Sequence, residues 1–161
     1  MSTSDHHILG GEIYFGKEVR TVSTLLGSCV AVVIWHPKLK YGGMCHIILP
    51  ENRQMNCSNK YANCAIASLS RGVKKVHSRP KDYVTHVYGG GDMFMNSGVS
   101  KSVGHRNVEA VLKILKQHRF VINRDDVGGN RYQKIKLDLV TGMVDAVSVK
   151  VGTTYKKRMR V

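Results

Sequence analysis

The chain has 161 residues, of which 42% are hydrophobic, and it carries a formal net charge of +14. This length and composition exclude wholesale disorder and allow one domain to bury a core without help from metals. No apolar run is long enough to span a bilayer, and the polar residues 1–7 lack a signal-peptide core, so we predict no membrane insertion. Four cysteines without a recognisable pairing pattern predict reduced thiols and a cytoplasmic location.

The first half of the chain reads mainly as short apolar segments separated by turns. The segments predicted in chain order are a loose tail at 1–10, a strand at 12–15, a lead-in at 19–26 to the turn before Cys29, a buried strand at 30–35, a turn at 37–40, a strand at 42–49 and a polar loop at 51–59.

The second half alternates between helical and strand periodicity. The predicted elements are a helix at 60–77 capped by Ser58 or Asn59, a strand at 83–88, a helix from Asn107, a strand at 120–123, a loop at 125–130, and two strands around 135–139 and 147–151 joined at Thr141-Gly142. Strands outnumber helices, so the fold class is α/β (α+β), a single domain with a mixed sheet and two main helices. We expect that domain to span 11–152, with a flexible N-terminal tail at 1–10 and a basic C-terminal tail at 153–161.

One cysteine stands at a conspicuous place in this pattern. Cys29 follows the turn Gly27-Ser28 and precedes a run of buried strand residues. A turn of this kind can hold a thiol rigidly at the mouth of a cleft. A free cysteine at the end of an apolar strand is also commonly a small buried hydrophobe, and this stretch alone favours that reading.

Hairpin geometry places a histidine near this thiol. If the turn at 37–40 pairs His36 with Tyr41, Ala31 lies opposite His46, and Cys29 becomes its diagonal neighbour on the same face. An imidazole next to a thiol assists formation of the nucleophilic thiolate. A third group normally fixes the imidazole tautomer, and the nearby hydroxyls are those of Thr21, Ser23, Thr24 and Ser28. Spacing alone does not choose among them.

Other uses of these residues fit the sequence less well. The cysteines lack the paired spacing of a zinc site, so we predict no metal and no cofactor. The triplet Gly89-Gly90-Gly91 matches neither phosphate-binding loop pattern and is interpreted as a tight loop lining a substrate cleft. The basic residues are scattered, with no zinc-finger, RNA-binding or helix-turn-helix pattern, so we predict no specific nucleic-acid partner and leave open an acidic protein partner.

Six ordered blocks give the chain a family resemblance. The sequence resembles the CheD family, the chemoreceptor glutamine deamidases of bacterial chemotaxis, through segments spread from about Glu12 to Val149. The blocks are Leu26-Gly27-Ser28-Cys29-Val30-Ala31-Val32, then 43–50, 60–62, 89–94, 104–108 and 128–131.

The resemblance implies a protein-glutamine glutaminase without a cofactor, with Cys29 as nucleophile and His46 as general base. The chemistry also needs donors for an oxyanion, and backbone N–H groups around the turn Gly27-Ser28-Cys29 are the candidates. The family's third residue, a threonine six positions before the cysteine, falls on Ser23, and Thr21 or Thr24 are the alternatives. The implied fold is a three-layer sandwich related to bacterial toxin deamidases. The implied partners are acidic chemoreceptor cytoplasmic domains and a CheC-type phosphatase, which leaves a non-catalytic regulatory binding module as the alternative function.

Overall fold

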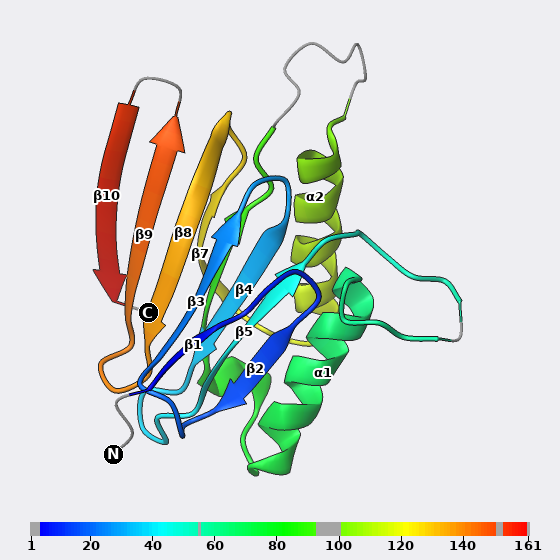
Figure 1. Cartoon of the computed structure of the whole chain (residues 1–161). Helices are drawn as coiled ribbons and strands as arrows, with labels where there is room; N and C mark the ends of the chain where they lie inside the picture. Colours follow the sequence, from blue (N-terminus) through cyan, green and yellow to red (C-terminus); the bar gives the residue numbers. More distant parts are fainter. Residues whose placement is uncertain (1–3, 55, 93–100, 151–152, 161) are drawn as a thin grey trace.

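Two mixed five-stranded sheets and a layer of helices form a three-layer sandwich, as predicted (Figure 1). The computed structural model describes residues 4–54, 56–92, 101–150 and 153–160. The first sheet has the order β1 (Asp5–His7), β3 (Thr21–Leu26), β8 (Arg131–Asp138), β9 (Met143–Lys150) and β10 (Thr153–Arg160). The second has the order β2 (Ile13–Gly16), β5 (Gly42–Ile47), β4 (Val30–Trp35), β6 (Val84–Gly89) and β7 (Ile122–Val127).

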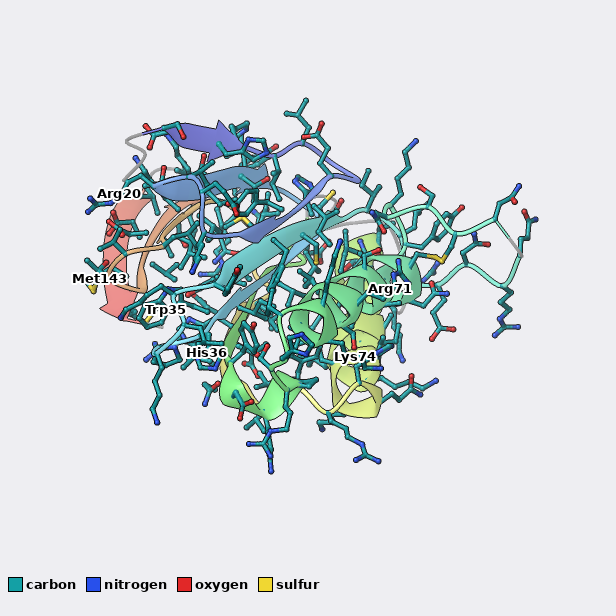
Figure 2. The ribbon with its side chains drawn as sticks, turned by 90° about the horizontal axis from the view of Figure 1, so that it is seen from below. Arg20, Trp35, His36, Arg71, Lys74 and Met143 are labelled. Carbon is teal, nitrogen blue, oxygen red and sulfur yellow. A yellow bond between two sulfur atoms is a disulfide. The ribbon has the colours of Figure 1, made fainter. Side chains whose placement is uncertain are left out.

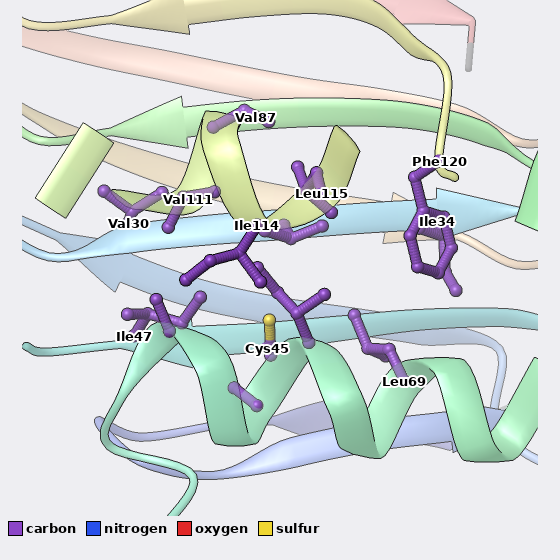
Figure 3. Packing of buried hydrophobic residues seen from close by; sticks show 14 of the residues in the cluster. Val30, Ile34, Cys45, Ile47, Leu69, Val87, Val111, Ile114, Leu115 and Phe120 are labelled. Atoms are coloured by element: carbon purple, nitrogen blue, oxygen red, sulfur yellow. The ribbon is translucent and has the colours of Figure 1, made fainter. Parts of the chain in front are cut away.

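The second sheet is the central layer, and every residue of β4 and β5 is buried. One of its faces packs on the first sheet through residues such as Val33, Met44 and Leu137. The other face packs on helices α1 (Ala62–Lys75) and α2 (Val103–Gln117). Figure 3 shows this second core, in which strand residues such as Ile34 and Ile47 meet Leu69 and Leu115 of the helices. Covering on both faces explains why these strands read as continuous apolar runs.

Both main helices are present, but their beginnings differ from the prediction. Helix α1 begins after Tyr61, with no side-chain cap from Ser58 or Asn59. Helix α2 begins at Val103, four residues before Asn107, because the Ser102 hydroxyl accepts a hydrogen bond from the His105 N–H and caps it. A short 3₁₀ helix, η1 (Pro80–Asp82), precedes β6. No helix within the described ranges is long and apolar enough to cross a membrane.

The segments predicted as tails and as a loop contain additional strands. Strand β1 pairs in parallel with β3, and β10 pairs along its length with β9, so neither 5–7 nor 153–160 is a loose tail. Strand β7 extends to Val127, where a loop was predicted, because it pairs in parallel with β6. These three strands have little local apolar pattern, lie at the edges of their sheets and are stabilised by pairing with the neighbouring strand.

The end of the sandwich opposite the β3–β4 turn is closed by Trp35 (Figure 2). Its indole N–H donates to the Leu139 carbonyl at 2.9 Å. Gly142 packs under the ring, where a Cβ would lie 2.5 Å from the indole carbons. Beside it, Arg20 and Met143 line a surface groove of about 490 Å³. This groove is therefore at the far end of the sheets from Cys29.

A disulfide joins Cys57 to Cys64, so the prediction of four reduced thiols is wrong for this pair. Cys64 lies in the first turn of α1, where it meets the preceding loop at a Cα–Cα distance of 5.4 Å. The same loop is held by Asn63, which exchanges two hydrogen bonds with the backbone of Asn52. A spacing of seven residues matches no familiar motif, and the sequence therefore gave no signal for the pairing. Cys29 and Cys45 remain free thiols.

Reduction of this disulfide is expected to lower the free energy of unfolding by about 2 kcal/mol, because a short closed loop constrains the unfolded chain. Urea denaturation of the protein with and without a thiol reductant measures the difference. The control is Cys57→Ser, which should show the lower stability and no response to the reductant. Titration of four free thiols in denatured, unreduced protein would contradict the pairing.

Candidate active site

Cys29 lies where the chain passes from one sheet to the other. The backbone leaves the first sheet at the end of β3, turns through Gly27 and Ser28, and enters the central sheet as β4 (Figure 1). The Cys29 side chain is partly exposed and packs against the core between the two sheets. Burial raises the pKa of its thiol above the ordinary value. The thiol is therefore mostly protonated at neutral pH unless a base assists it.

The predicted hairpin register is confirmed. The His36 N–H donates to the Tyr41 carbonyl at 2.8 Å, and Ala31 of β4 pairs with His46 of β5. Because side chains alternate along a strand, His46 shares with Met44 the face that packs on the first sheet. Cys29 packs against that same layer. The structure thus brings the thiol and the imidazole to the same face and the same end of the central sheet.

The hydroxyl that contacts His46 belongs to Thr24. Its Oγ1 lies 2.7 Å from His46 Nδ1 and 2.8 Å from the carbonyl oxygen of Ile8. A carbonyl only accepts, so the single hydroxyl hydrogen is donated to Ile8, and the Thr24 oxygen accepts from His46 Nδ1–H. Neutral His46 therefore carries its proton on Nδ1. Its Nε2 lone pair is left available as a base.

The structure does not bring Ser23 to His46. Ser23 Oγ lies 3.0 Å from Nδ1 of His7, on the opposite face of β3. Thr24 points inward with Val22 and Leu26, which belong to the core between the sheets. Counting six residues back from the cysteine therefore selects the wrong face, since a shift of one residue reverses the direction of a strand side chain. The inward alternation of Val22 and Leu26 was the signal that favoured Thr24.

The N-terminal segment packs around the imidazole. The Gly11 N–H donates to the His46 carbonyl at 2.8 Å, and the His46 N–H donates to the Glu12 carbonyl at 3.2 Å. A Cβ at Gly10 would lie 3.7 Å from His46 Nε2. Burial is the main cause that lowers the pKa of His46, the charge of His7 lowers it further, and the charge of Glu12 opposes them. His46 is accordingly neutral at pH 7, as a general base requires.

The glycine triplet lies directly behind the nucleophile turn. The Gly91 N–H donates to the Gly27 carbonyl at 2.9 Å, and the Gly90 N–H donates to the Cys29 carbonyl at 2.8 Å. Gly89 has a φ of +99°, and a Cβ there would lie 2.2 Å from the Cys29 oxygen. Only glycine permits this approach. The triplet therefore fixes the turn that carries the thiol, and its predicted contact with substrate stays a prediction.

The remaining cysteines do not join this site. The Cys45 thiol is buried in the core between sheet and helices, and burial raises its pKa to about 12. Cys57 and Cys64 are bonded to each other. Within the part of the chain that the structure describes, no three histidine, cysteine or carboxylate side chains gather in a way that would hold a metal ion.

A thiol and an imidazole on one face, with a hydroxyl that holds the second imidazole nitrogen, form a pattern typical of cysteine hydrolases. Comparison with known families is more specific. Residues 48–148 match the family model described as CheD chemotactic sensory transduction. The chain belongs to the CheD family. The matched range begins just after His46 and includes neither Cys29 nor His46.

Relatives of this chain cover most of its length. A probable chemoreceptor glutamine deamidase CheD of Pseudomonas syringae pv. tomato is 35% identical over 139 residues, which is 83% of each chain. The protein of the same name from Methanococcus maripaludis strain S2 is 34% identical over 148 residues, covering 91% of this chain and 94% of the relative. Among solved structures, the Bacillus licheniformis hypothetical protein YfiH aligns with 78% of this chain and 59% of its own at 10% identity and a TM-score of 0.46, a similarity too low to support any inference.

Replacing Thr24 by valine is expected to remove the fixed Nδ1–H tautomer of His46, because valine keeps the shape but has no hydroxyl acceptor. Long-range ¹H–¹⁵N correlation spectra of the imidazole at pH 8 measure the tautomer. The matched control is Ser23→Ala, which removes the neighbouring hydroxyl from the other face and should leave the His46 signals unchanged. A tautomer change in Ser23→Ala alone would show that Ser23 is the partner.

Proposed function

We propose that this chain is a cysteine-dependent deamidase that converts glutamine side chains of chemoreceptors to glutamate. The observation that carries the proposal is the hydrogen bond from His46 Nδ1–H to Thr24, which leaves the other imidazole nitrogen as a base on the face that Cys29 shares. Relatives that are 34–35% identical are named probable chemoreceptor glutamine deamidases. We assign Cys29 as the nucleophile, His46 as the general base and Thr24 as the residue that orients it.

In the first step, the Cys29 thiol and the His46 imidazole both begin neutral. The pKa of the thiol is raised by burial and the pKa of the imidazole is lowered by burial, so an ion pair at rest is disfavoured. His46 Nε2 removes the thiol proton as sulfur attacks the carboxamide carbon of glutamine. The new imidazolium retains its Nδ1–H bond to Thr24, which stabilises the charge as it forms.

The tetrahedral intermediate has an oxyanion that needs fixed hydrogen-bond donors. The N–H groups of Ser28 and Cys29 donate no hydrogen bond to the described residues. Both belong to the turn in which the Gly27 and Cys29 carbonyls accept hydrogen bonds from the glycine triplet. We propose these two N–H groups as the oxyanion donors, because they have no partner among the described residues and belong to the turn that carries the reacting thiol.

Collapse of the intermediate completes the deamidation. His46 returns its proton to the departing nitrogen, which leaves as ammonia, and a γ-glutamyl thioester remains on Cys29. A water molecule then gives a proton to His46 and attacks the thioester carbon. The carbon–sulfur bond breaks, the sulfur regains the proton, and glutamate is released. One water is consumed and one ammonia is formed per glutamine.

The charge of the chain supports an acidic macromolecular substrate. A net charge of +14 attracts acidic helices over the distance of a Debye length and raises the encounter rate. We therefore propose acidic cytoplasmic receptor domains as the substrate. The family resemblance supports two further proposals, the cytoplasm as the location and a CheC-type phosphatase as a partner. The alternative is a regulatory module that binds receptors or that phosphatase without catalysis.

Incubation with a chemoreceptor cytoplasmic fragment should convert specific glutamines to glutamate, detected by peptide mass spectrometry. Cys29→Ala and His46→Ala should abolish conversion, while Cys45→Ala, which removes the other free thiol, should retain it. The rate should fall as pH drops below the lowered pKa of His46, because the protonated imidazole no longer accepts a proton. Conversion by Cys29→Ala at the native rate would refute the proposal, and tight receptor binding without any conversion would favour the regulatory alternative.

Added salt should slow the reaction on receptor fragments and not on a short neutral glutamine peptide. Raising the salt from about 0.05 to 0.5 M screens charges beyond a few ångströms and removes the attraction between a basic protein and acidic helices. The ratio of kcat/KM for the two substrates measures this effect and serves as its own control. An equal response of both substrates would show that the positive charge does not guide the receptor.

A further inference from the structure

We infer that Asn107 is a positioning residue that fixes the direction of the Cys29 N–H, the oxyanion donor next to the thiol. This inference rests on the proposed acyl-transfer chemistry at Cys29. Asn107 lies in the second turn of α2 and is fully buried. In the sequence, Asn107 is one polar residue of a predicted helix and of a family block. Its side chain donates a hydrogen bond to the Ser28 carbonyl, which immediately precedes Cys29.

The Asn107 amide holds two backbone carbonyls at once. Its Nδ2 donates to the Ser28 carbonyl at 3.0 Å and to the Ile48 carbonyl at 3.0 Å. Both partners are acceptors only, so the nitrogen and not the oxygen of the amide must face them. Ser28 immediately precedes the nucleophile, and Ile48 follows His46 by two residues. One side chain therefore ties the nucleophile turn to the end of the strand that carries the base.

Because a peptide group is planar, this hydrogen bond also fixes the direction of the Cys29 N–H. The C=O of Ser28 and the N–H of Cys29 belong to one planar peptide group, and no peptide bond of the described chain is cis. In a trans peptide the two bonds point in opposite directions. A carbonyl held against α2 therefore directs the Cys29 N–H away from the helix. That N–H has no hydrogen-bond partner among the described residues and is available to an oxyanion.

The neighbouring peptide groups are held in the same way. The Gly27 carbonyl accepts from the Gly91 N–H, which fixes the N–H of Ser28, and the Cys29 carbonyl accepts from the Gly90 N–H. Three successive carbonyls thus accept hydrogen bonds. Those of Gly27 and Cys29 accept from the glycine triplet, and that of Ser28 between them accepts from Asn107. Without Asn107, the middle peptide group would be the one free to rotate.

The approach of helix α2 makes the contact feasible. Gly104 lies one turn before Asn107, and a Cβ at this position would lie 2.4 Å from the carbonyl oxygens of Gly90 and Gly91. The absence of a side chain lets the helix pack directly on the glycine triplet. Asn107 then lies within reach of the turn with a side chain of only two rotatable bonds, which limits the entropy lost in fixing it.

The experiment compares two reagents that react with the Cys29 thiol. Acylation by p-nitrophenyl acetate passes through an oxyanion, whereas alkylation by iodoacetamide is a displacement that forms none. We expect Asn107→Ala to slow acylation at least about tenfold, since loss of one oxyanion donor costs about a hundredfold or more, and to change alkylation less than about twofold. Asn107→Asp keeps the volume of the side chain, replaces the amide donor and should give the same selective loss.

The matched control is Asn63→Ala. Asn63 also bridges a helix to loop backbone by two hydrogen bonds, but it lies in α1 and contacts Asn52. Its removal should alter neither rate, and Cys29→Ala provides the background of each reagent. Unfolding temperatures of all variants are measured alongside.

A parallel change of both rates in Asn107→Ala and Asn107→Asp, or no change in either, would overturn the inference. A parallel change would mean that Asn107 maintains the thiol and its base and not the oxyanion donor. The two reagents are independent of receptor glutamine. A wild-type protein that shows the selective effect but deamidates no receptor fragment would refute the proposed substrate and leave the role of Asn107 intact.

Discussion

The hydrogen bond between Thr24 and His46 crosses the interface of the two sheets, and the organisation of the site depends on it. Thr24 comes from the first sheet and His46 from the central sheet, while Cys29 lies on the connection between them. His46 acquires its Nδ1–H tautomer only when the two sheets are docked. The core between the sheets therefore has two effects: it stabilises the fold and it positions the imidazole. Val33 and Leu137 belong to this core.

Local patterns in the sequence predicted strands β2, β4, β5 and β6 of the central sheet, and only part of β7. The hairpin from Val30 to Ile47 follows from two apolar runs and a turn with one proline, and its register correctly placed Ala31 opposite His46. The helices were found from their apolar period. The layered fold class and the family followed from these elements together with the ordered motifs.

Features that depend on distant contacts were not predicted. Strand β1 has no apolar pattern, and only its pairing with β3 gives it structure. The choice of Thr24 over Ser23 required knowing which face of β3 meets the central sheet. Asn107 reads as one polar residue in a helix, and its contact with Ser28 spans 79 residues of sequence. In each case the determining partner is remote in the chain, and the inward alternation of Val22 and Leu26, which favours Thr24, is the one local signal among the three.

The position of the Ile8 carbonyl affects how the protein should be tagged and purified. It takes the Thr24 hydrogen and so decides which way the imidazole is protonated, although the residues on either side of it include no reacting group. In the proposed assignment, the segment from β1 to Gly11 thus helps to position the general base. A purification tag that displaces this strand, or a protease that removes it, is expected to release the Thr24 hydroxyl and with it the tautomer of His46, while leaving Cys29 and His46 chemically unaltered.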